Sequence, residues 1–320
     1  MREINFVKKN EARWRLLESS IKDLTPDELA ENFIELTDDV AYARTFYPNS
    51  NTERYLNALL SKFHQVIYKN KKEKGSRFLT FWKYEVPLKV REHHRTLFYS
   101  FLFFAIAMLI GVFSAAKDDT FVRLILGDGY VNQTLRNIES GDPMAIYKSG
   151  GSTYSFLMIT INNIRVSFIA FVAGVFFSIG TVYVLLNNGV MLGAFQYFFY
   201  EKNVFFDSVL SIWIHGTLEI SAIIIAGGAG LVIGNSILFP KTFSRAASFR
   251  KGARDGLIII VGLIPVFIIA GFLEGFVTRY TDMPVLLSLA IILSSLAFVV
   301  FYFIVYPIYL DKKLKNEPTN

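Results

Sequence analysis

The sequence predicts an all-α protein, a polytopic membrane helix bundle of about six membrane elements with a helical cytoplasmic N-terminal segment. The first observation is composition: of 320 residues, 52% are hydrophobic and 16% aromatic, and the mean hydropathy is +0.38. Several membrane spans account for such an apolar chain. The second observation is that the long apolar runs begin only after Leu97. The third is that Lys and Arg gather outside these runs, as they do in cytoplasmic loops.

We divide the chain into three parts. Residues 1–95 form a helical cytoplasmic or juxtamembrane segment, residues 96–310 the transmembrane bundle, and residues 311–320 a basic cytoplasmic tail. The N-terminus lacks the apolar core of a cleavable signal peptide, so we expect the first apolar run to act as an internal signal anchor that stays in the protein.

Capping signals define the helices of the first part. Thr25, Pro26 and Glu28 fit the N-cap, the first helical position and a capping box. Ser50 and Glu53 repeat the capping-box pattern further along. The stretch 77–94 mixes aromatic with basic residues, which suits either a helix lying on an anionic leaflet or an ordinary packed helix.

The apolar runs predict the membrane elements in order. The first, residues 97–116, has twenty residues without a charge and matches the thickness of the hydrocarbon core. The "NNG" at 187–189 predicts a break in the chain, and the fourth run is long enough for us to expect a second break near His215 and Gly216. The later runs are residues 155–186, 190–200, 205–240, 256–278 and 284–307.

Charge distribution predicts the orientation. Residues 1–96, the loop 241–254 with five positive charges and no acid, and the basic tail belong in the cytoplasm, whereas the mixed loop 117–154 belongs outside. An even number of crossings, most simply six, satisfies all of these. The short run 190–200 then either crosses the membrane or pairs with 205–216 as a re-entrant hairpin.

Six polar residues inside the apolar runs should lie together in the outer half of the bilayer. They are Asn162, Asn163, Arg165, His215, Glu219 and Glu274. Ionisable groups at membrane depth are costly unless they are partnered. In one interpretation Arg165 clasps Glu219 or Glu274, and His215 bonds a nearby oxygen. In the other, the six residues line a polar cavity for a head group, a small polar solute or a partner helix.

Small residues mark a packing face in the fourth run. Gly227, Gly230 and Gly234 fall on nearby faces of a helix, and such faces let helices approach closely. We expect burial within the bundle rather than dimerisation. Self-association into a homo-oligomer through such faces is a further hypothesis.

Catalytic motifs are missing from the sequence. There is no cysteine, no H-E-x-x-H, no G-x-S-x-G and no phosphate-binding loop. A metal site would have one imidazole and two carboxylates at best, so we expect no metal, no cofactor and no enzymatic activity. The net charge of +6 does not imply nucleic acid as a partner, because in a membrane protein the distribution of Lys and Arg matters more than their sum.

Several motifs, taken in order, resemble the stage II sporulation protein M family. "NNG" precedes "MLGAF", then His215, Gly216, Glu219 and Ala222 form an H-G-x-x-E-[IL]-x-A core, followed by "GGAGL" and Pro240. The stretch "ITINNIRVSFIAFVAG" is similar to the span of the family that bears asparagine and arginine. The resemblance covers roughly residues 95–310.

The resemblance implies a multi-pass protein of the bacterial inner (cytoplasmic) membrane. The sporulation member acts as a membrane scaffold in engulfment, together with peptidoglycan-degrading partners. Many relatives occur in bacteria that form no spores, so engulfment itself is not carried over. The family supplies no established chemistry for His215 and Glu219.

Two functions follow as expectations. The first is a non-enzymatic scaffold or assembly component of a cell-envelope complex, with membrane lipids and other envelope or membrane proteins as partners. The second is a transporter or lipid-handling protein that uses the outward-facing polar cavity. An intramembrane hydrolase is a third hypothesis that no motif supports.

Overall fold

The computed structural model describes residues 2–21, 24–67, 76–148, 151–280 and 283–316. Every regular element in these ranges is a helix, as the sequence predicts. The chain divides into two compact units, residues 1–77 and 78–320. The boundary therefore lies before the stretch 78–94, which the sequence pattern assigned to the N-terminal part.

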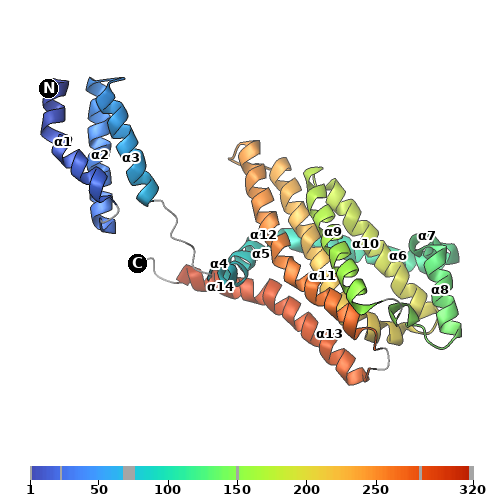
Figure 1. The fold of residues 1–320 in the computed structure, drawn as a ribbon. Coiled ribbons are helices and arrows are strands. Elements are labelled where there is room, and N and C mark those ends of the chain that lie inside the picture. The colour runs from blue at the N-terminus through green and yellow to red at the C-terminus, as the bar shows by residue number, and fades with distance from the viewer. Residues whose placement is uncertain (1, 22–23, 68–75, 149–150, 281–282, 317–320) are drawn as a thin grey trace. The chain divides into compact units, whose positions relative to one another are not determined.

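The first unit is a bundle of three helices, α1 (Glu3–Ser20), α2 (Pro26–Phe46) and α3 (Asn51–Ile67) (Figure 1). The capping box at the start of α2 is present: the Glu28 amide donates to the Thr25 hydroxyl, and the Thr25 amide donates to the Glu28 carboxylate at 2.8 Å. The fully buried side chains of the unit include Trp14, Leu36, Leu56, Leu59 and Phe63. The unit thus has its own hydrophobic core.

The second unit contains, among the described residues, six helical stretches that are long and apolar enough to cross a membrane. This agrees with the predicted number of membrane elements. They are α6 (His94–Lys117), α9 with η3 (Ser152–Val175), α10 (Ile179–Glu201), α11 (Phe205–Leu238), α12 with η4 (Arg245–Val277), and α13 with η5 and α14 (Val285–Asn316) (Figure 1).

The predicted break at 187–189 is wrong, because these residues lie inside α10. The side-chain amides of Asn187 and Asn188 donate back to the carbonyls of Tyr183 and Val184, so both are satisfied within the helix. Gly189 serves packing, since a Cβ there would lie 2.6 Å from the Phe104 carbonyl oxygen of α6. The chain instead turns at Phe177 and Ser178, which have positive φ.

The expected break near His215 and Gly216 is also wrong. Helix α11 runs without interruption for 34 residues, and α10 meets it through the short connection 202–204. The run 190–200 is therefore the second half of a long helix, and the re-entrant alternative is excluded. A continuous α11 keeps all of its backbone groups bonded, as membrane depth requires.

Helix α11 is the central helix of the bundle and carries the glycine face. Cβ atoms at Gly227, Gly230 and Gly234 would meet Leu185, Thr181 and Ser178 of the α10 segment. At the other side of the same contact, Gly174 of η3 faces the Gly230 backbone. The glycines therefore lie within the bundle, as expected.

The stretch before α6 packs on the bundle, which favours the packed-helix interpretation. It comprises α4 (Ser76–Thr80), η1 (Phe81–Glu85) and α5 (Val86–Glu92). The Trp82 indole donates to the Gly262 carbonyl at 3.3 Å, and the Tyr302 hydroxyl donates to the Trp82 carbonyl at 2.6 Å. Val86 and Val90 are fully buried.

Three short helices lie at one end of the bundle, α7 (Asp119–Leu126), α8 (Asp128–Glu139) and η2 (Ala145–Lys148). We call this end the loop side. We call the opposite end, with the loop 239–244 and α5, the basic side. The predicted tail begins inside α14 (Tyr306–Asn316), where Asp311 accepts a bond from Arg91 of α5 at 3.2 Å.

Candidate functional site

Helix length places Glu219 and Glu274 near the loop-side boundary of the hydrocarbon. Glu219 lies 19 residues from Leu238, the last residue of α11, which corresponds to roughly 28 Å at 1.5 Å per residue. Glu274 lies 18 residues after Gly256, where the apolar part of α12 begins, or roughly 27 Å. A hydrocarbon core is about 30 Å thick. Both carboxylates therefore fall at the same level.

His215, Glu219 and Glu274 form a compact group from two helices. The His215 Nδ1 lies 3.0 Å from the Thr278 Oγ1, and its Nε2 lies 3.6 Å from the Glu274 Oε2. One donor atom from each of the three residues lies within 4.8 Å of the others. The exposed fractions of the His215 and Glu274 side chains are 5% and 18%. The polar atoms thus meet in a nearly enclosed place.

A local change of helix type positions Glu274. Residues Leu273–Val277 form a π-helical turn, η4, and the Thr278 amide donates to the Leu273 carbonyl five residues earlier at 2.8 Å. Such turns are rare and frequently occur at functional sites. Gly275 lets η4 touch α9, since a Cβ there would lie 2.9 Å from the Phe156 Cβ. The turn therefore fixes Glu274 between α9 and α11.

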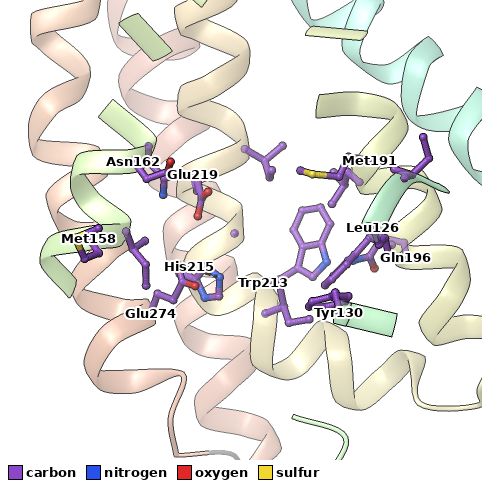
Figure 2. A pocket seen from close by; sticks show the side chains of 18 residues that line it. Leu126, Tyr130, Met158, Asn162, Met191, Gln196, Trp213, His215, Glu219 and Glu274 are labelled. Carbon is purple, nitrogen blue, oxygen red and sulfur yellow. Dashed lines mark ion pairs between the residues drawn. The ribbon is translucent and has the colours of Figure 1, made fainter. Parts of the chain in front are cut away.

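The group lines a cavity of about 650 Å³ between α7, α8, α9, α10, α11 and η4. Figure 2 shows His215, Glu219 and Glu274 on one wall, with Tyr130 and Gln196 on the opposite wall. Apolar side chains supply much of the remaining lining. Cavities of this size, mostly apolar with a few converging polar groups, are typical of sites for small ligands.

The two asparagines reach the cavity in different ways. Asn162 and Asn163 of α9 both line it, but Asn163 is only 4% exposed, whereas Asn162 lies on the exposed surface. The predicted cluster therefore forms with both amides at its edge.

The predicted Arg165 clasp is wrong. Arg165 is exposed, does not line the cavity and forms no ion pair with any residue the structure describes. The reason is helical phase: Arg165 follows Asn163 by two residues, about 200° around the helix, so it projects from the opposite side.

Sequence reasoning missed three polar contributors, Thr278, Tyr130 and Gln196. Gln196 is a single amide in the apolar run "MLGAFQYFFY", which is a signal of the kind that singled out His215. Thr278 follows Glu274 by one helical turn and ends the predicted run 256–278, but a single threonine at the end of a span is no distinctive signal. Tyr130 lies in α8, outside the apolar runs, and no pattern connects it with the cavity.

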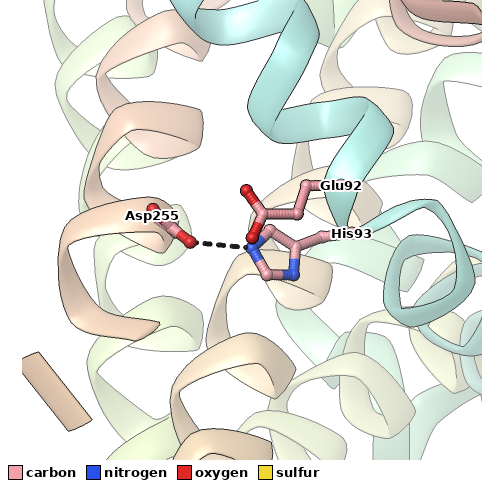
Figure 3. Close-up of side chains that lie close together, drawn as sticks. All are labelled: Glu92, His93 and Asp255. Carbon is pink, nitrogen blue, oxygen red and sulfur yellow. Dashed lines mark hydrogen bonds and ion pairs between the residues drawn. The ribbon is translucent and has the colours of Figure 1, made fainter. Parts of the chain in front are cut away.

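A second polar group lies on the basic side (Figure 3). Asp255, with a side chain 3% exposed, accepts from Lys89 at 2.8 Å and lies 3.1 Å from the His93 Nε2. Glu92 pairs with Lys89 at 2.7 Å and with Lys251 at 2.9 Å. These contacts tie α5 to α12.

The pKa values of Lys89 and Glu92 reflect this pairing. Partial burial alone would lower the pKa of Lys89, but its bonds to Asp255 and Glu92 raise it above the usual value. Burial would likewise raise the pKa of Glu92, but the two lysines hold it below the usual value. Both groups are therefore charged at neutral pH.

The fold and the cavity define a polytopic α-helical membrane protein with a polar cavity toward one face of its bundle. A family model described as Stage II sporulation protein M matches residues 100–279, more than half of the chain. The chain therefore belongs to the stage II sporulation protein M family, as the resemblance predicted. Residues 4–69 match a domain of unknown function (DUF8413), which corresponds to the first unit. No curated protein and no solved structure matches the chain.

Proposed function

We propose that this chain is a non-enzymatic protein of the bacterial inner membrane that binds an amphiphilic molecule in the cavity near its outer face. Its termini would both be cytoplasmic, with the basic side inward. The observation that carries the proposal is the cavity of about 650 Å³ with converging polar groups at the level of the membrane boundary. An amphiphile has to satisfy a polar and an apolar environment at this level.

The two kinds of lining suit the two ends of such a molecule. His215, Glu219 and Glu274 offer hydrogen-bonding and charged groups to a head group. Met158, Met191 and Trp213 offer apolar surface to a chain, and methionine adapts readily to different shapes. The function would be lipid handling, or transport if the cavity opens alternately to the two sides of the membrane.

Gly216 provides a way to block the cavity without disturbing the helix. It lines the cavity, and a Cβ there would meet only the Ile212 Cγ2, at 4.0 Å. The leucine side chain of Gly216→Leu would therefore occupy part of the cavity without a clash at its Cβ. Gly129 of α8 is a matched control, because it is exposed, has nothing within 4 Å of its Cβ position and does not line the cavity.

The test is labelling of the full-length protein in membranes with a photoactivatable lipid, followed by mass spectrometry of the labelled peptides. Label is expected on peptides of α9, α10 and α11 that line the cavity. Gly216→Leu should reduce it at least fivefold, and Gly129→Leu should leave it unchanged. Equal cavity labelling of both variants would refute the proposal.

A partner-binding scaffold is the second candidate, and the first unit favours it. This unit has its own core, and all of its described helices lie outside the predicted membrane spans. Several large apolar side chains on it are exposed, including Ile4, Leu16 and Ile34. Cross-linking in cells followed by purification tests this function: an envelope protein should be recovered with the wild type and lost after Ile34→Lys. Recovery that is unchanged by substitutions across this surface would argue against it.

A further inference from the structure

Two groups in the bundle each bring one histidine and two carboxylates together, and their surroundings differ. In the basic-side group of Glu92, His93 and Asp255, lysines pair with both carboxylates. In the loop-side group of His215, Glu219 and Glu274, no ion pair with a lysine or arginine is formed within the described ranges. Two carboxylates at membrane depth without a cationic side chain either carry protons or pair with another source of positive charge.

The geometry of the loop-side group suits a metal ion. In a tetrahedral site with metal–ligand distances near 2.1 Å, two ligand atoms lie about 3.4 Å apart. The His215 Nε2 and the Glu274 Oε2 are 3.6 Å apart, and the Glu219 carboxylate lies within 4.8 Å of both. Small side-chain rotations would therefore bring all three atoms onto one ion.

Thr278 adds the support that metal-binding histidines usually have. Its hydroxyl lies 3.0 Å from the His215 Nδ1. In the tautomer with the proton on Nδ1, this hydroxyl is the acceptor and Nε2 is free to serve as the ligand nitrogen. Metal-binding histidines almost always donate their second ring nitrogen to an oxygen in this way. The ring is thus held with its Nε2 toward the two carboxylates.

An unsatisfied amide on the same cavity points independently to a missing ligand. Gln196 is 6% exposed, and its side-chain nitrogen has no hydrogen-bond partner among the described residues. Its side chain lines the cavity. Buried polar groups of this kind normally have a partner. Water or an anion bound to a metal ion would supply one.

The neighbouring arginine is engaged elsewhere. Arg279 shares a smaller adjacent cavity with Glu274, but its Nη2 donates to the Lys148 carbonyl at 2.7 Å. It does not line the larger cavity. The Arg279 guanidinium is thus bonded to the backbone outside the larger cavity and does not occupy the space between the three ligand atoms.

We propose that His215, Glu219 and Glu274 bind one divalent transition-metal ion of the Zn²⁺ class in the loop-side cavity. A mixed nitrogen and carboxylate donor set suits such ions. Three protein ligands leave a coordination position open toward the cavity. This revises the expectation from the sequence of no metal, which noted one imidazole and two carboxylates as the most that such a site could offer. The site does not depend on the binding of an amphiphile.

The experiment measures Zn²⁺ alone on the full-length protein, purified in mild detergent and stripped with a chelator. Isothermal titration is expected to give one ion per chain. Glu219→Gln and Glu274→Gln keep the side-chain shape and should each weaken binding at least tenfold. Thr278→Val removes only the oxygen that orients His215 and should also weaken it about tenfold. Glu92→Gln, in the lysine-paired group, is the matched control and should not change it.

Cobalt gives a readout that does not depend on the variants. Co²⁺ bound to the wild type should show visible absorption bands of a four- or five-coordinate site, displaced by one equivalent of Zn²⁺. The proposal is overturned if the wild type binds no Zn²⁺, or if both glutamine variants bind it as tightly as the wild type. Because no lipid is needed, these outcomes are separate from those of the labelling experiment.

Discussion

Asp255→Ala should destabilise the bundle more than any other single removal of a carboxylate on the basic side. The Asp255 side chain is only 3% exposed and accepts from both Lys89 and His93. Its removal breaks two contacts between α5 and α12 at once. Lys89 would keep only Glu92 as a partner.

The structure sets the size of the effect. Removing one partner of a fully buried ion pair costs about 3–5 kcal/mol, because the other charge is stranded. Lys89 is 27% exposed and retains its bond to Glu92, so its charge is only partly stranded. Hydrogen bonds to charged groups are worth about 1.5–3 kcal/mol each. We therefore expect a loss of about 2–4 kcal/mol in the free energy of unfolding.

Reversible unfolding of the purified protein in mixed detergent and SDS, followed by circular dichroism, measures this loss. Asp128→Ala is the matched control, because Asp128 is 75% exposed and pairs with Arg123 only at the surface. The control should change the free energy by less than about 1 kcal/mol. A loss below 1 kcal/mol for Asp255→Ala, or an equal loss for both variants, would refute the reasoning.

Two further predictions concern packing and pH. Gly230→Leu should lower the free energy of unfolding by about 1–3 kcal/mol. The reason is that a Cβ there would lie 3.0 Å from the Thr181 Cγ2 and even closer to the Ala170 carbonyl. Gly216→Ala should be neutral or slightly stabilising in the same unfolding assay. The lowered pKa of Glu92 gives stability that is complete above its unfolded pKa of about 4.3 and is lost as the pH falls through the folded value. The raised pKa of Lys89 gives stability that is complete below its unfolded pKa of about 10.4 and is lost as the pH rises through the folded value. Glu92→Gln should therefore reduce the slope on the acid side, where Asp255 still contributes, and weaken the basic side without abolishing it, because Asp255 still pairs with Lys89. An unchanged acid side would contradict this assignment.

Hydropathy was sufficient to predict the membrane elements, but their ends followed local chemistry that it does not contain. The "NNG" stretch was predicted as a break because asparagine and glycine commonly end helices. In the structure the two amides bond back to the preceding turn and the glycine allows contact with α6. These partners belong to the folded bundle, so the sequence pattern alone could not distinguish packing from a break.

Five of the six polar residues singled out in the sequence, all except Arg165, line the cavity, because counting residues along the helices places them at similar levels. Its composition depended on which face each residue occupies. Arg165 lies on the opposite face of α9 from Asn163. The π-helical turn at Leu273–Val277 changes the phase of Glu274, and no periodic pattern in the sequence indicates such a turn.

The exposed position of Arg165 has a consequence for the lipid around the protein. It lies ten residues from the end of the stretch Ser152–Val175, roughly 15 Å and thus near the middle of the hydrocarbon. A charge at this depth costs about 2.5–3.5 kcal/mol on insertion scales. Snorkelling of the side chain toward the membrane surface, local thinning of the bilayer and entry of water keep the cost this low. Since no described carboxylate pairs with it, lipid phosphates must move inward to meet the guanidinium. The bilayer beside α9 is therefore expected to be thinner than its surroundings, so that the protein deforms the membrane in which it lies.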